Sequence, residues 1–473
     1  MLIFKKVFNT KLNFKNAAFI DENNANYTYK DLYNNILNCS KLLKIKANSK
    51  IVTLISNSFE LITIFLICSY KNCTLFPLST STKIQKIDDL NKIYKFDYFI
   101  IENLIIEKKI KKYKKKIFYK KNFLNLNNNN YCPKFSKKEI KNFLVLFTSG
   151  TTGNPKPLLF SEKNKFLRSY KQSITYNLGK KEKILLPYSL DHSVGIRLMF
   201  LSLINHSTII LINNFKPELW YSKCLNHEVT FSMLISSHLK KIVNEKIKVN
   251  KLKAMKNIVS VSTLLDKQTK KKLTGHSFKF HEMYGASEIS TVASIKHTIN
   301  NKFNGSVGKI LDFVDLRILK KGKIYKKDGI EGEIICKTPL MFNGYYKDNK
   351  ITKEAYFEGY FKTGDIGYLN KKHLYFLGRL KNIIKVSGLI VYPEDIEKIL
   401  LKSKYISECL VKGIYDDDQG ESIIAYIVGN KNKEFEILEH CLKYLENFQV
   451  PKRFIFKNKF PRTSLGKINR NLI

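Results

Sequence analysis

The chain has 473 residues, of which 44% are hydrophobic, so it can bury two or three full domain cores and is neither disordered nor fibrous. Its formal net charge of +43 could indicate a nucleic-acid or membrane partner. Lys is spread along the whole length, however, and Arg, on which nucleic-acid readers depend, is scarce, so we interpret the charge as compositional and expect no nucleic-acid partner.

The cysteines and the apolar segments indicate in which cellular compartment the protein is expected. The eight Cys are scattered, with no C-x-x-C pair, and predict reduced, mostly buried thiols rather than a metal cluster. The N-terminus lacks a long apolar segment, and the most apolar later stretch, Leu61 to Cys68, is too short to span a bilayer. We therefore expect a cytoplasmic protein without an integral membrane segment.

The first 142 residues predict a parallel α/β sheet. Apolar residues recur at helical spacing over 32–43, an apolar strand follows at 51–55, and an apolar helix begins near Ser58. Helices that alternate with buried strands are typical of parallel sheets. The Lys-rich segment 108–121 and the Asn run 127–130 predict a solvated surface connection.

A buried strand at 143–146 leads into a loop that can aim backbone N–H groups and hydroxyls at one anion: Thr148, Ser149, Gly150, Thr151, Thr152 and Gly153. Lys156 adds a positive charge. The spacing differs from that of the nucleotide P-loop, and a plain polar turn is the alternative. The string resembles the signature loop of the adenylate-forming superfamily, the acyl-CoA synthetases and their relatives, which embraces the β- and γ-phosphates of ATP. Pro157 stands where that family usually has Gly.

Residues 184–200 resemble the segment that flanks the carboxylic-acid pocket in the family, through Pro187, His192 and Gly195. Asp191 has two interpretations. In amino-acid-activating relatives an Asp in a similar string holds the substrate ammonium. Alternatively, Asp191 caps a helix that begins at Ser193.

Residues 259–266 resemble a sheet strand and the turn beside the adenine, which places Ser262 in the substrate pocket. The turn lacks both Gly and the Pro of the family. Larger residues there should narrow the pocket or displace the backbone. We therefore expect a smaller or differently shaped acyl group than a long fatty chain, and a low KM for palmitate would contradict this.

The motif at 283–288 resembles the nucleotide motif of the family. The Tyr284 ring can stack on a purine, Gly285 lets the backbone approach the nucleotide, and the Ser287 hydroxyl can bond the α-phosphate. The Glu288 carboxylate can hold Mg²⁺, which prefers oxygen ligands. Taken alone, the motif would be a Tyr-Gly turn with a surface Glu.

The strings between 305 and 346 resemble the family's β-barrel subdomain, and Gly-punctuated short strands fit it. After them, Asp365 lies in a Thr-Gly-Asp string that resembles the family motif whose carboxylate accepts hydrogen bonds from both ribose hydroxyls. The alternative for this string alone is a common turn.

The last hundred residues resemble the hand-over to a small C-terminal domain. The resemblance places Arg379 near the ribose and phosphate, Lys381 at the hinge, and Gly388 along the channel of the thiol acceptor. Lys467 matches the lysine that enters the site during adenylation. Its ammonium would lie between carboxylate and triphosphate and offset charge in the transition state.

The motifs run in family order from about residue 27 to 470, and the chain is identified as a member of this superfamily. The resemblance implies an α/β fold with two domains. The N-terminal domain, 1–378, would hold two αβαβα-type sheets plus a small β-barrel subdomain, and residues 379–473 would form a small mobile α+β domain.

The resemblance also implies a two-step reaction in which ATP and a carboxylic acid form an acyl-adenylate that passes to a thiol, with Mg²⁺ as cofactor. Ser287, Glu288 and Lys467 would be catalytic, and CoA is the expected acceptor. One alternative is a ligase that loads an amino acid or acyl group onto a phosphopantetheinyl carrier protein. Another is a degenerate binding protein without turnover, which the low Gly content would favour.

Overall fold

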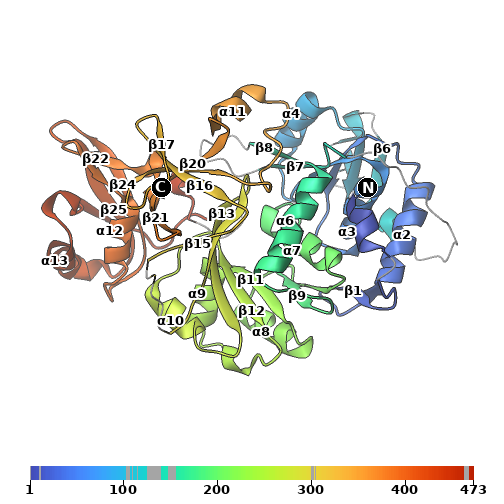
Figure 1. The fold of residues 1–473 in the computed structure, drawn as a ribbon, viewed down its shortest axis with the longest axis horizontal. Coiled ribbons are helices and arrows are strands. Elements are labelled where there is room, and N and C mark those ends of the chain that lie inside the picture. The colour runs from blue at the N-terminus through green and yellow to red at the C-terminus, as the bar shows by residue number, and fades with distance from the viewer. Residues whose placement is uncertain are drawn as a thin grey trace.

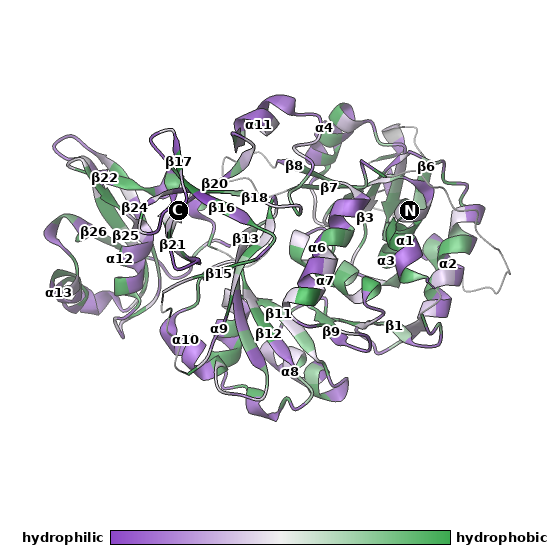
Figure 2. Cartoon of the chain, viewed as in Figure 1, coloured by the Kyte–Doolittle hydropathy of each residue, from purple (hydrophilic) through white to green (hydrophobic). Residues whose placement is uncertain are grey.

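The computed structural model describes residues 2–9, 12–102, 107–108, 110–113, 116–124, 140–147, 156–299, 303, 305–462 and 468–473. Three sheets organise these residues (Figure 1). Hydrophobic residues concentrate in the central strands and in α3, whereas α10 and α11 are largely hydrophilic (Figure 2). No helix in this part of the chain is long and apolar enough to cross a membrane. The seven cysteines among these residues are free and buried, as expected.

The first sheet has the strand order β6-β5-β3-β4-β7-β8 and is parallel except for its last pair. Its strands are β3 (Lys50–Leu54), β4 (Thr74–Pro77), β5 (Tyr98–Ile101), β6 (Lys116–Tyr119), β7 (Leu144–Phe147) and β8 (Pro157–Phe160). The helices α1 (Leu2–Val7), α2 (Tyr29–Leu42), α3 (Phe59–Lys71) and α4 (Ile84–Tyr94) belong to this region. Strands β4 and β5 are buried throughout, which suits a parallel sheet covered on both faces.

Local signals set the helix starts in this region. Thr28 and Asp31 form a reciprocal capping box at α2, and Ser58 accepts a hydrogen bond from the backbone of Leu61 at α3. Helix α3 ends at Asn72, which adopts a left-handed conformation at φ 59°. The predicted alternation of helix and strand is therefore confirmed here.

The second sheet has a parallel core. Its strands are β1 (Ala17–Ile20), β2 (Asn26–Thr28), β9 (Lys183–Leu186), β10 (Thr208–Leu211), β11 (Phe231–Ile235), β12 (Asn257–Val261) and β13 (Lys279–Ala286). The accompanying helices are α6 (Glu162–Thr175), α7 (Ser193–Ile204), α8 (Pro217–Asn226), α9 (Ser236–Asn244) and α10 (Lys267–Leu273). Helices α6 and α7 pack against each other between the two sheets (Figure 1).

The expected Gly-punctuated subdomain consists of antiparallel strands that continue the second sheet through the β13–β14 and β14–β15 pairs. They are β14 (Ser290–Lys296), β15 (Gly308–Ile310), β16 (Asp315–Lys320), β17 (Lys323–Tyr325), β18 (Gly332–Lys337), β19 (Tyr356–Phe357), β20 (Tyr360–Asn370) and β21 (His373–Arg379), with α11 (Asn349–Glu354). This continuity brings β20 and β21 to the end of β13.

The C-terminal residues form a third sheet with its own hydrophobic core. Its elements are β22 (Ile384–Val386), β23 (Leu389–Val391), α12 (Pro393–Leu400), β24 (Ile406–Asp416), β25 (Gly420–Gly429), α13 (Glu434–Tyr444) and β26 (Arg453–Phe456). A single 3-10 turn, Leu380–Asn382, links β21 to β22. The boundary between 378 and 379 stays a prediction, and this turn is the segment that follows it.

Candidate active site

Tyr284 near the end of β13, Asp365 in the middle of β20 and Arg379 at the end of β21 meet at one point. The Tyr284 hydroxyl donates a 2.6 Å hydrogen bond to Asp365 Oδ2, and Arg379 Nε forms an ion pair with Oδ1 at 2.6 Å without hydrogen-bond alignment. Asp365 pairs with Arg379 across the β20–β21 ladder, so the register itself sets this contact. Burial raises the pKa of Asp365 to about 6 in spite of the Arg379 charge. A buried carboxylate with spare lone pairs is thus held beside Tyr284 and Arg379.

The backbone after Tyr284 is held by an arginine that sequence reasoning did not assign. Arg168 of α6 is buried and donates from Nη1 to Ser287 O and from Nη2 to Glu288 O, both at 2.7 Å. Its Nε donates to Leu340 O at 2.8 Å. A planar fork with several donors can serve three carbonyls at once, and Lys cannot. The sequence hint to this role is that Arg is scarce in this Lys-rich chain and nevertheless occurs at position 168.

Glu288 lies near three positively charged side chains. Burial raises the pKa of its carboxyl, and the charges of Arg168, Arg379 and Lys156 oppose that effect. Lys156 Nζ lies 5.2 Å from the centroid of the Tyr345 ring. No cluster of three or more metal-ligating side chains exists among the described residues. A cation at Glu288 would therefore need oxygens from a ligand, which is how Mg²⁺ is usually bound beside phosphates.

The phosphate-loop residues Thr148 to Gly153 lie outside the described residues, as does Lys467. Strands β7 and β8 flank the segment Thr148 to Gly153 and pair antiparallel, with Phe147 opposite Pro157. Pro157 starts β8, and its carbonyl accepts a bond from Tyr346 at 2.8 Å. The replacement of the family's Gly by Pro157 is thus compatible with a paired strand position.

The predicted acid-pocket segment begins helix α7. The N-cap residue is His192, without a side-chain cap bond, so the interpretation of Asp191 as N-cap is wrong. Asp191 Oδ1 is buried, accepts no hydrogen bond from the described residues and lies 3.8 Å from His192 Nε2. A Cβ on Gly195 would lie 2.3 Å from Ser189 O, so only Gly permits this approach of the helix to the turn. Asn57 fixes the same turn by bonding Tyr188 O and the Leu190 N–H.

Ser262 keeps a conformation that favours glycine, with φ 95°, at an exposed position. A serine in this conformation carries local strain, and the expected narrowing of the pocket or displacement of the backbone stays a prediction. Ser236 donates to Thr263 O next to it. Glu282 of β13 accepts a 3.1 Å bond from the Leu265 N–H at the end of the same turn.

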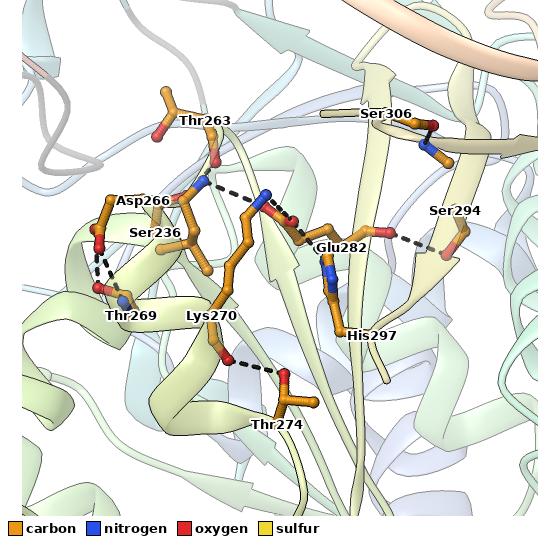
Figure 3. A network of polar contacts seen from close by, with 12 residues as sticks. Ser236, Thr263, Asp266, Thr269, Lys270, Thr274, Glu282, Ser294, His297 and Ser306 are labelled. Carbon is orange, nitrogen blue, oxygen red and sulfur yellow. Dashed lines mark hydrogen bonds and ion pairs between the residues drawn. The ribbon is translucent and has the colours of Figure 1, made fainter. Parts of the chain in front are cut away.

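Glu282 is the centre of a buried charged network (Figure 3). Lys270 Nζ and His297 Nε2 each lie 2.6 Å from Glu282 Oε2. Burial acts to raise the pKa of Glu282, but the contacts with His297 and Lys270 outweigh it and hold the pKa below its usual value. The network ties the 262–265 turn to α10 and to the strand that carries Tyr284.

The C-terminal candidates lie at the surface. Lys381 lies within the 3-10 turn, and most of its surface is exposed. The part that is buried, together with the charges of Arg379 and Arg470, lowers its pKa. Gly388 is exposed in the β22–β23 turn at φ 81°. Arg470 donates to Glu397 Oε1 at 2.5 Å and to Val411 O at 3.0 Å, which anchors the chain just beyond position 467.

The structure thus assembles one group of predicted residues and leaves others apart. Tyr284, Asp365 and Arg379 are in direct contact. Arg168 holds the backbone of Ser287, which follows Tyr284 in the chain. The charges of Arg379 and Lys156 both act on Glu288. Gly388 is at an exposed turn instead. Arg168 and Glu282 are the additions that the tertiary structure makes to the site.

Comparisons with known proteins give the chain its relatives. Residues 9–346 match the family model described as AMP-binding enzyme, and residues 395–467 match the AMP-binding enzyme C-terminal domain. A 2-succinylbenzoate–CoA ligase of Bacillus licheniformis is 29% identical over 336 residues, covering 69% of this chain and 68% of that protein.

Two solved structures show the same fold. ATP-bound MatB from Rhodopseudomonas palustris superposes with a TM-score of 0.90 at 20% identity, covering 99% of this chain and 97% of that one. The O-succinylbenzoate coenzyme A synthetase MenE of Bacillus subtilis, in complex with ATP and magnesium ion, has a TM-score of 0.86 at 20% identity, covering 99% and 98%. The α/β fold with a separate C-terminal domain is thereby confirmed.

Proposed function

The chain belongs to the family of AMP-binding enzymes, and on this premise we propose that it activates a carboxylic acid with ATP and transfers the acyl group to the thiol of CoA. The observation that carries the proposal is the Tyr284–Asp365–Arg379 cluster, which offers a buried carboxylate and an aromatic ring side by side. These groups suit a ribose diol and a purine. The acids named for the relatives differ from one another, so no acid is carried over to this chain.

Each residue has a role in the first half-reaction. Asp365 accepts the ribose hydroxyls with its remaining lone pairs, and Tyr284 presents its ring to the base. Arg379 neutralises Asp365 and lies next to the phosphates. The Thr148–Lys156 loop and the Ser287 hydroxyl bind the phosphates, and Lys467 orients the carboxylate against the α-phosphate by position and charge.

Glu288 fits a role in binding Mg²⁺. The carboxylate is partly buried, its charged form is penalised, and an added cation would offset that penalty. When bound, Mg²⁺ neutralises negative charge on the phosphates. The acyl-adenylate then passes to the thiol after the C-terminal domain turns about Lys381 and brings Gly388 toward the acceptor, a step of the kind that often limits turnover.

A second candidate is a ligase that activates an amino acid for a phosphopantetheinyl carrier protein. The observation in its favour is the buried, unpartnered Oδ1 of Asp191, which could accept a bond from a substrate ammonium. We expect a cytoplasmic enzyme in either case.

The test is ATP–pyrophosphate exchange across a panel of carboxylic acids and amino acids, followed by CoA-dependent release of AMP for each positive. Exchange with a simple acid and AMP release with CoA support the first proposal. Exchange restricted to amino acids favours the second. Exchange with none of them would leave a binding protein of the same fold.

A further inference from the structure

Arg197 is a buried cation that forms no ion pair with any described residue. It is one of only two buried arginines of the seven in the chain, at 7% exposure. Its one hydrogen bond among the described residues runs from Nη1 to the thioether Sδ of Met283, at 3.5 Å. A thioether is a weak acceptor, and a guanidinium has five N–H donors and keeps its charge in proteins. Most of the binding capacity of this side chain is therefore unused.

The surroundings of Arg197 do not compensate its charge. Lys165 and Arg168 of the neighbouring α6 are buried close by. Burial, together with the charges of Arg168 and Arg197, lowers the pKa of Lys165 well below its usual value. The group that electrostatically favours the Arg197 charge is Tyr176, but burial raises the pKa of Tyr176 to about 12, so its phenol is neutral at physiological pH. The residues around Arg197 thus leave a local excess of positive charge.

Arg168 shows what a satisfied buried arginine looks like in the same protein. It donates to three backbone carbonyls and stacks over the Phe160 ring, with its guanidinium carbon 4.7 Å from the ring centroid. Arg197 has neither. Because an uncompensated buried charge is costly, a buried charge is normally paired or hydrogen-bonded. A partner supplied by a ligand would meet that requirement.

The position of Arg197 indicates which ligand. It is the fifth residue of α7, the helix that begins at Ser193 within the predicted acid-pocket segment. Its contact Met283 directly precedes Tyr284, whose hydroxyl binds Asp365. The Arg197 guanidinium thus lies between α7, which the resemblance assigns to the acid pocket, and β13, which it assigns to the nucleotide.

We infer that Arg197 binds a second anionic group of the acid, so that the substrate is a dicarboxylic acid with one carboxylate activated and the other paired with this guanidinium. The inference rests on the proposed acid-activating function and names its substrate class. A guanidinium fork matches a carboxylate in two parallel hydrogen bonds, which gives orientation as well as affinity. An apolar chain end would leave the buried charge unpaired, which disfavours fatty acids.

The experiment compares mono- and dicarboxylic acids of matched carbon number in ATP–pyrophosphate exchange, for the wild type, Arg197→Met and Arg197→Lys. Met has a similar length and no charge. We expect the wild type to prefer a dicarboxylate, and Arg197→Met to lose about 100-fold in kcat/KM for it. The KM for ATP and the rate with monocarboxylates should change little, and Arg197→Lys should retain part of the preference. Arg453→Met, at an exposed arginine, is the matched control.

Calorimetric titration with the same dicarboxylic acids needs no turnover, so it separates this inference from the proposed function. Binding by the wild type and none by Arg197→Met supports the inference even if no acid gives exchange. Four results would overturn it: no binding of any dicarboxylate by the wild type, equal use of monocarboxylates, an equal loss for every acid in Arg197→Met, or a raised KM for ATP in that variant. The thermal stability of unliganded Arg197→Met should equal or exceed that of the wild type, whereas a structural ion-pair role would lower it.

Discussion

The Tyr284 hydroxyl donates a 2.6 Å hydrogen bond to Asp365, which joins two motifs that are 81 residues apart in the chain. Burial raises the pKa of both groups, and the proximity of Asp365 adds to the effect on Tyr284. Tyr284 is therefore the neutral donor, and Asp365 changes its charge near pH 6. This pair makes nucleotide binding and stability depend on pH in opposite directions.

Nucleotide affinity should rise as the pH increases through about 6, because only ionised Asp365 offers both oxygens as acceptors. Asp365→Asn should bind ATP about 10- to 100-fold more weakly at pH 7.5, with little dependence on pH. Calorimetric titration between pH 5 and pH 8 measures both. Asp417→Asn, at an exposed carboxylate, is the control, and an unchanged ATP affinity in Asp365→Asn would remove Asp365 from the nucleotide site.

The same substitution should stabilise the unliganded protein. The folded-state pKa of Asp365 is raised from 3.8 to about 6, so the folded state binds more protons than the unfolded state between these values, and stability falls as the pH rises through that window. At pH 8, Asp365→Asn should gain up to about 3 kcal/mol of unfolding free energy, and the gain should vanish near pH 4. Urea denaturation at both pH values measures it. A loss of stability at pH 8 would mean that the ion pair with Arg379 outweighs the burial penalty.

Arg168→Lys should destabilise the protein by about 2–4 kcal/mol, because an ammonium cannot serve the three carbonyls that Arg168 holds. Two of them belong to Ser287 and Glu288, so ATP affinity should also fall by about tenfold. Thermal unfolding and ATP titration measure the two effects. Arg453→Lys makes the same exchange at an exposed site. Unchanged affinity with reduced stability would assign Arg168 a purely structural role.

Glu282→Gln should cost about 3 kcal/mol at pH 7, because it leaves Lys270 and the Leu265 turn without their buried carboxylate. The folded-state pKa of Glu282 is depressed, so its stabilisation is present above the ordinary value of 4.5 and is lost as the pH falls through the folded pKa. The two proteins should therefore converge in acid. Denaturation at pH 7 and pH 4 measures this, with Glu354→Gln as the exposed control. A pH-independent difference would contradict the charge-based explanation.

Lys467→Ala should reduce ATP–pyrophosphate exchange by at least about 100-fold with little change in ATP affinity, because the ammonium acts mainly on charge in the transition state. Lys459→Ala removes an exposed lysine of the same domain and should leave exchange unchanged. Equal rates in wild type and Lys467→Ala would argue against catalysis by this lysine.

The sequence by itself determined the elements and the family. Its apolar periodicities predicted the parallel strands and helices, since buried faces must repeat with the period of each element. The resemblance of its short motifs to those of the family implied that Tyr284, Asp365 and Arg379 belong to one site, and the structure brings these three side chains into contact.

Only the tertiary structure decided which charges are satisfied. Arg168 and Arg197 look alike in the sequence, yet three carbonyls surround one and a single thioether contacts the other. Asp191 could have been the helix cap, but the N-cap of α7 is His192, and the buried Oδ1 of Asp191 accepts no hydrogen bond from the described residues. Such differences arise from contacts between segments far apart in the chain, which local pattern does not encode. The burial that raises the pKa of Asp365 depends in the same way on where distant strands end.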